Sequence, residues 1–196
     1  MTRRAEEIGS VYLKPGELCI SESPVVVTTV LGSCVSLTMF HRESGTGAIC
    51  HAVQPICRHQ GQCPGACPDL FRYVACVVPV MVNRFRRCAG SLAQVEVKLF
   101  GGGAILRRGE WGRLAPVGRQ NVEAAMEAIE TAGLRLKVAD VGGPLGRRIR
   151  FNTQNGEVLL QRVRSLNTAS RTAGTTAPSA GPRTSDRPMA AGAFRG

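Results

Sequence analysis

Aromatic residues are scarce in this chain: Phe, Tyr and Trp together make up 5% of its 196 residues. The core must therefore be built mainly from Val, Leu, Ile and Ala. No apolar run approaches the roughly 20 residues that a membrane-spanning helix needs. The first ten residues, MTRRAEEIGS, carry charge but no apolar segment, which argues against a signal peptide. We therefore expect a cytoplasmic protein without membrane insertion.

Acidic residues are also few: 14 Asp and Glu stand against 25 Lys and Arg, which gives a net charge of +11. A basic surface favours acidic partners, which include nucleic acid, anionic lipid and acidic proteins. The sequence has no zinc-finger spacing, recognition-helix pattern or aromatic–basic strand pattern, so we expect no nucleic-acid partner. Both an acidic protein partner and a simple bias toward arginine fit the charge.

Cysteine is plentiful, with 8 residues, but thiols stay free in a reducing cytoplasm. Cys57, His59, Cys63 and Cys67 lie in the loop 56–68, and their spacing departs from the usual zinc arrangements. We expect a surface loop there and no metal. Gly101-Gly102-Gly103 follows a predicted strand but lacks the lysine and hydroxyl residue of a phosphate loop, so no cofactor is expected.

Two apolar patterns predict the secondary structure. Alternating and β-branched runs predict strands, and Asn155-Gly156 is a strong hairpin signal. Apolar residues at helical spacing predict a helix after Asp69, which Pro79 should kink or split, and a second helix over about 121–132 with Asn121 as its cap. The predicted strands are a pair within 11–20, then 25–30, 34–40, 48–54, 93–100, 134–141, 147–151 and 157–163.

The order of these elements predicts the fold class. Strands dominate and cluster toward both ends of the chain, which favours an α+β fold over an alternating doubly wound one. We expect a layered α/β sandwich with mostly antiparallel strands and two main helices. Residues 168–196 are rich in Ala, Thr, Gly, Ser and Pro without periodicity, so they are predicted to form a disordered tail after a single domain of residues 1–167.

A cysteine on a tight bend, one strand before a histidine, is the candidate for chemistry. Cys34 follows Gly32-Ser33, and His51 lies in the next predicted strand. If those strands pair about a midpoint between residues 42 and 43, Cys34 and His51 are directly opposite, with Cβ atoms about 5 Å apart. The histidine could then take the thiol proton, and backbone N–H groups at Gly32-Ser33 could form an oxyanion hole. A buried cysteine is, however, usually just a small apolar residue.

The segments TTVLGSCVSLTMF (28–40) and HAVQP (51–55) resemble the chemoreceptor glutamine deamidases, the CheD family of bacterial chemotaxis. Gln54 and the cysteine loop depart from the family pattern. Four later stretches resemble the same family in the same order, so the resemblance covers about residues 8–163: YVACVVPVMV, VKLFGGGA, GRQNVEAAMEAI and ADVGGPLGRRIRFNTQNGEVLLQRV.

The resemblance implies roles for individual residues. Cys34 would be the nucleophile, His51 the general base, and Thr28 the third member that orients the histidine; Gly32 and Ser33 would lie near the oxyanion. Thr28 precedes the cysteine by six residues, and Thr29 is the rival if the strand carries a bulge. The implied reaction converts specific glutamines on the cytoplasmic helices of methyl-accepting chemoreceptors to glutamate through a Cys thioester. A CheC-type phosphatase is an implied further partner.

Two other functions compete with this one. The same cysteine and histidine would serve a cysteine peptidase or an acyltransferase, which differ in whether a backbone or a side-chain amide enters the cleft. A non-catalytic chemotaxis adaptor that binds receptors or CheC is the second alternative. The presence of Thr28, Cys34 and His51 together argues against an inactive enzyme.

Overall fold

The computed structural model describes residues 8–57, 59, 67–104 and 116–164. The predicted tail and most of the cysteine loop, including Cys63, lie outside these residues. The predicted domain boundary at residue 167 does so too and stays a prediction.

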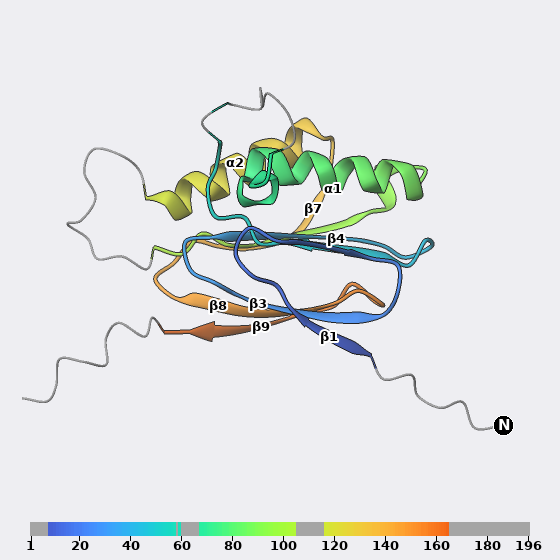
Figure 1. Cartoon of the computed structure of the whole chain (residues 1–196), viewed down its shortest axis with the longest axis horizontal. Helices are drawn as coiled ribbons and strands as arrows, with labels where there is room; N and C mark the ends of the chain where they lie inside the picture. The colour runs from blue at the N-terminus through green and yellow to red at the C-terminus, as the bar shows by residue number, and fades with distance from the viewer. Residues whose placement is uncertain (1–7, 58, 60–66, 105–115, 165–196) are drawn as a thin grey trace, which may run out of the picture. The chain divides into compact units, whose positions relative to one another are not determined.

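Two β-sheets and one layer of helices make up the described part of the chain (Figure 1). One sheet has four strands in the order β1-β3-β8-β9, and the other has five in the order β2-β5-β4-β6-β7. Among these strands only the β1–β3 and β6–β7 pairs are parallel. The strands are β1 (Gly9–Tyr12), β2 (Leu18–Ser21), β3 (Val25–Leu31), β4 (Val35–His41), β5 (Thr46–Cys50), β6 (Glu96–Gly101), β7 (Leu136–Val141), β8 (Gly146–Asn152) and β9 (Val158–Val163).

Two α-helices, α1 (Val74–Cys88) and α2 (Val117–Thr131), cover the outer face of the five-stranded sheet (Figure 1). The short 3₁₀ turns η1 (Leu70–Arg72) and η2 (Leu92–Gln94) flank α1. Pro79 was predicted to kink or split the helix; α1 runs through it without interruption, so it does not split the helix. Pro79 lies on an exposed face in the N-terminal half of the helix, where the ring points to solvent. None of the described helices is both long and apolar enough to cross a membrane.

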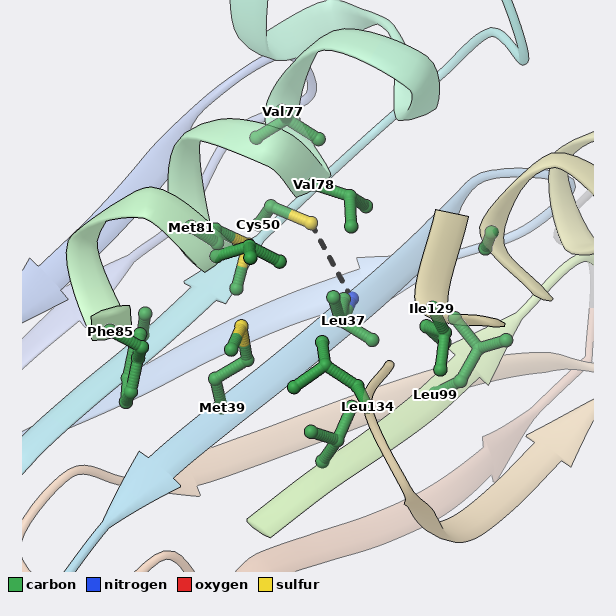
Figure 2. Packing of buried hydrophobic residues seen from close by; sticks show 14 of the residues in the cluster. Leu37, Met39, Cys50, Val77, Val78, Met81, Phe85, Leu99, Ile129 and Leu134 are labelled. Atoms are coloured by element: carbon green, nitrogen blue, oxygen red, sulfur yellow. Dashed lines mark hydrogen bonds between the residues drawn. The ribbon is translucent and has the colours of Figure 1, made fainter. Parts of the chain in front are cut away.

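The five-stranded sheet, called the central sheet below, has an apolar layer on each face. Leu37, Met39 and Cys50 pack beneath the helices against Met81 and Phe85 (Figure 2). The opposite layer lies between the two sheets and contains, among others, Leu31, Phe40, Ile49, Phe100, Ile149 and Phe151. Because side chains alternate along each strand, neighbouring residues of β4 and β5 enter different layers. The α+β layered sandwich predicted from the sequence is confirmed.

Of the two predicted strand pairs, the one near the C-terminal end of the domain is confirmed and the one near its N-terminal end is wrong. The Asn155-Gly156 hairpin is confirmed: β8 and β9 pair antiparallel, and Gly156 adopts a φ of +75° at the turn. The expected strand pair within 11–20 is wrong, because β1 pairs with β3 in one sheet and β2 pairs with β5 in the other. The Pro15-Gly16 break therefore marks a crossing between sheets and not a hairpin.

Candidate active site

Cys34 and His51 face the same layer, the one between the two sheets. The strands β4 and β5 pair so that Thr38 is opposite Ile49, and an isolated bridge continues this register to Val35 and Ala52. By that register Ser36 is opposite His51, and Cys34 is its diagonal neighbour. The predicted direct opposition of Cys34 and His51 is therefore wrong by two residues. An even shift leaves both side chains on one face, where diagonal neighbours still come within about 7–8 Å.

A hydroxyl from the other sheet holds the imidazole of His51. Thr29 Oγ1 lies 2.8 Å from His51 Nδ1, and the same hydroxyl donates its proton to the carbonyl of Leu13 at 2.8 Å. A hydroxyl has a single proton, so Oγ1 must accept a hydrogen bond from Nδ1–H. The proton of the neutral ring therefore sits on Nδ1, and Nε2 carries the lone pair. Nε2 is buried and has no hydrogen-bond partner within the described residues.

The residue that orients the histidine is Thr29, not the predicted Thr28. Thr29 is fully buried, with Val27 and Leu31 on the same face of β3, whereas the Thr28 side chain points to the opposite face. There Thr28 pairs with Tyr12 on one side and Arg150 on the other. The pairing of β3 with β8 is regular, so Thr29 reaches the histidine without the bulge that the rival assignment required.

Burial sets the resting protonation state of the pair. It raises the pKa of the Cys34 thiol, against smaller lowering effects from the backbone N–H of Cys34 and the charge of Arg72. It also lowers the pKa of His51, against the raising effects of the Leu13 carbonyl and the Glu17 carboxylate. Both shifts favour neutral forms. In the free site these shifts favour a neutral thiol and a neutral imidazole over an ion pair.

Backbone hydrogen bonds from the glycine loop 101–103 to carbonyl groups of residues 32–34 hold the bend at Cys34 in place. The N–H of Gly102 donates to the Cys34 carbonyl at 2.8 Å, and the N–H of Gly103 donates to the Gly32 carbonyl at 2.8 Å. The glycine loop thus approaches the bend backbone to backbone: a Cβ at Gly101 would lie 2.2 Å from the Cys34 carbonyl oxygen. This contact gives the run of glycines, which lacks the pattern of a phosphate loop, a structural role beside Cys34.

Sequence reasoning missed three residues around the pair. Asn121 lies within α2 and is fully buried; it is not the expected cap, because α2 begins at Val117. Ser36 is buried, and its hydroxyl has no hydrogen-bond partner among the described residues. Arg72, at the end of η1, acts on Cys34 through its charge. Only Asn121 had a signal in the sequence, as a polar residue at the start of an apolar helical pattern.

Cys50, the cysteine that directly precedes His51, lies in a different environment from Cys34. Cys50 adjoins His51 but points toward the helices, where its sulfur accepts the Leu37 N–H at 3.5 Å (Figure 2). Burial raises its pKa to about 11, as suits an unreactive core residue. In the part of the chain that the structure describes, no three His, Cys, Asp or Glu side chains gather as metal ligands.

Comparison with known proteins places these residues in a family context. The family model described as CheD chemotactic sensory transduction matches residues 62–162. A Geobacter sulfurreducens protein named "Probable chemoreceptor glutamine deamidase CheD 2" is 44% identical over 83% of this chain and 96% of its own length. Proteins named "Probable chemoreceptor glutamine deamidase CheD" from Maridesulfovibrio salexigens and Methanococcus maripaludis are 34% and 29% identical over 83% and 80% of this chain, and 97% of their own lengths.

Among solved structures, YfiH of Bacillus licheniformis, described as a hypothetical protein, overlaps 64% of this chain and 51% of its own. The overlap has a TM-score of 0.42 at 13% identity. A likeness of this degree does not bear on function.

Proposed function

The chain belongs to the CheD family, and on that premise we propose that it deamidates specific glutamine side chains of chemoreceptors, with Cys34 as nucleophile and His51 as general base. Its relatives are named chemoreceptor glutamine deamidases, which are amidohydrolases acting on glutamine side chains. The family model matches residues that follow both Cys34 and His51. The roles of these two residues therefore rest on geometry.

One observation carries the proposal: the ring of His51 is held at Nδ1 by Thr29, and its basic Nε2 is unpartnered among the described residues on the face that Cys34 shares. A nucleophile, a base and a group that fixes the base together make up the general arrangement for covalent catalysis. Thr29 supplies the orientation that a carboxylate supplies in other triads, but without a negative charge. A neutral hydroxyl stabilises the imidazolium less, which agrees with a resting pair that is not ionised.

The first half of the proposed reaction forms a thioester. Nε2 of His51 takes the Cys34 proton as Sγ attacks the carbon of the glutamine amide. The resulting oxyanion is stabilised by backbone N–H groups at the bend, with those of Ser33 and Cys34 as the candidates. His51 then gives its proton to the nitrogen, the C–N bond breaks, and ammonia leaves. General acid–base help of this kind is typically worth about 10²- to 10⁴-fold.

The second half regenerates the enzyme with water. Nε2 removes a proton from a water molecule, the hydroxide adds to the thioester carbon, and the C–S bond breaks. His51 returns the proton to the departing sulfur, and glutamate is the product. The substrate gains a carboxylate, which places a negative charge on a receptor helix and changes the repulsion between neighbouring helices.

The test is ammonia release from a cytoplasmic receptor fragment. Wild type should release ammonia and convert glutamine to glutamate, detected by mass spectrometry of the fragment. Cys34→Ala should release none, and His51→Ala should lose most of the rate. Hydroxylamine should trap the thioester as a hydroxamate. If an active wild type yields no trapped adduct and Cys34→Ala keeps its rate, the covalent mechanism is wrong.

The same assay separates the alternatives. A cysteine peptidase would shorten the fragment, whereas a deamidase leaves its length unchanged. A non-catalytic adaptor would bind the fragment without converting it, and Cys34→Ala would keep the cellular effect. A CheC-type partner stays a prediction of the family resemblance, and a pull-down with purified CheC of the same organism would test it.

A further inference from the structure

We infer that Asn121 is a positioning residue for the proposed deamidation, because its side-chain amide joins the Cys34 bend to the strand end that follows His51. The inference rests on the proposed function for its catalytic readout. Asn121 lies on α2, which contributes neither the proposed nucleophile Cys34 nor the proposed base His51. Its side chain is fully buried against the end of the central sheet.

Both protons of the amide are used at the site. Nδ2 donates to the carbonyl of Ser33 at 3.0 Å and to the carbonyl of Val53 at 3.0 Å. Ser33 precedes the cysteine, and Val53 is the residue opposite Cys34 when the β4–β5 register is continued. The backbone bonds between these strands stop one pair earlier, at Val35 and Ala52. Asn121 therefore bridges the two chain segments just beyond their last backbone hydrogen bonds, next to Cys34.

The bond to Ser33 also sets the direction of a candidate oxyanion donor. Ser33 C=O and Cys34 N–H belong to one planar trans peptide, so they point in opposite directions. Asn121 draws the Ser33 carbonyl toward α2, which turns the Cys34 N–H away from the helix layer. That N–H lies close enough to Cys34 Sγ to affect its pKa. Within the described residues it donates to no backbone carbonyl.

The oxygen of the Asn121 amide indicates that stabilising the fold is not the main role of this side chain. Asn121 Oδ1 is buried and has no hydrogen-bond partner among the described residues. An amide flip would place this oxygen against two carbonyls, so the observed orientation is the favourable one. A buried acceptor without a partner costs roughly 1–3 kcal/mol. The chain thus tolerates a destabilising atom to keep two donors at this position.

The experiment compares full-length wild type with Asn121→Ala and with Asn121→Ser, which keeps one donor. Two quantities are measured: kcat and KM for ammonia release from a receptor fragment, and the pH dependence of Cys34 alkylation by iodoacetamide, followed on the Cys34 peptide by mass spectrometry. We expect kcat to fall by about tenfold or more with little change in KM, within the range that general acid–base catalysis covers. The Cys34 alkylation profile should move to higher pH.

A matched control separates positioning from folding. Thr153 is buried and its hydroxyl also contacts two backbone carbonyls, those of Ser23 and Val25, away from Cys34. Thr153→Val should lower the melting temperature but leave kcat and the alkylation profile unchanged. The inference is overturned if Asn121→Ser, or a folded Asn121→Ala, keeps kcat and the profile within about twofold of wild type while lowering the melting temperature as the control does.

The alkylation measurement needs no receptor, so the two proposals can fail separately. A wild type that releases no ammonia, but whose Cys34 reactivity depends on both His51 and Asn121, would refute the deamidase and support the positioning role. An active wild type with unaffected Asn121 variants would refute the positioning role alone.

Discussion

Thr29 and His51 meet between two sheets, with Oγ1 of the threonine 2.8 Å from Nδ1 of the histidine. The threonine comes from β3 of the four-stranded sheet, and the histidine directly follows β5 of the five-stranded sheet. The Leu13 carbonyl takes the only hydroxyl proton and so decides that the threonine accepts. This single contact fixes which ring nitrogen is basic.

Thr29 should be sensitive to substitution, whereas its neighbour Thr28 should not. Thr29→Val removes the acceptor of the His51 Nδ1–H and leaves the Leu13 carbonyl without its hydroxyl donor. We therefore expect a loss of about tenfold or more in kcat and of roughly 1–3 kcal/mol in the free energy of unfolding. Thr28→Val places a good strand former on the outer face and should change stability by less than about 0.5 kcal/mol, with activity unchanged. Steady-state kinetics and denaturant unfolding check both. Equal losses would restore Thr28 as the partner.

Cys34 should be a thiol at neutral pH. Burial raises the pKa of the Cys34 thiol, so the difference in ultraviolet thiolate absorbance between wild type and Cys34→Ser should appear only at alkaline pH. Burial lowers the pKa of His51, so the imidazole stays unprotonated at more acidic pH than an ordinary histidine with a pKa of about 6.5. The acid limb of kcat/KM should therefore lie below that value. A thiolate band at neutral pH would contradict the neutral pair.

Arg72 should assist thiolate formation through charge alone. Its guanidinium lowers the pKa of Cys34, although burial has the larger, opposite effect. Arg72→Gln should move the pH profile of Cys34 alkylation further toward alkaline pH and slow the reaction at neutral pH. Arg72→Lys keeps the charge and should behave more like wild type. Because Arg72 is exposed, added salt should reduce the difference between wild type and Arg72→Gln. A Lys variant as slow as Gln would instead indicate a contact specific to the guanidinium.

Gly102 should be far more sensitive to substitution than Gly90, although both have similar backbone angles. Their φ values are +65° and +61°, so alanine strains either backbone by about 1–2 kcal/mol. A Cβ at Gly102 would also lie 2.3 Å from Val122 Cγ2 and 2.7 Å from the Gly118 carbonyl, whereas at Gly90 it would meet nothing within 4 Å.

We therefore expect Gly102→Ala to lose roughly 1–3 kcal/mol more than Gly90→Ala, as in overpacked cores. It should also lose activity, because the Gly102 N–H holds the Cys34 carbonyl. Chemical denaturation and ammonia release measure the two effects. If both variants retain full activity, the glycine loop does not support the bend.

Local residue patterns were enough to predict the class of fold and the shared face of Cys34 and His51. Alternation along 34–40 and 48–54 places every second residue in the same layer. The observed register differs from the predicted one by two residues, and an even difference keeps Cys34 and His51 on the same face. The hairpin at Asn155-Gly156 was equally local, because the turn requires a residue with positive φ. Family resemblance added the chemistry, since its motifs are contiguous stretches of residues.

The residues that complete the site could be identified only from contacts between elements that are distant in the chain. Either Thr28 or Thr29 can face inward on an isolated strand, and the choice was made when Val27 and Leu31 of the same strand packed against the central sheet. Asn121 resembled a helix cap until α2 crossed the end of that sheet, 88 positions away from Ser33 in the chain. Hydrogen bonds over such separations depend on how layers stack, which no local pattern of residues encodes.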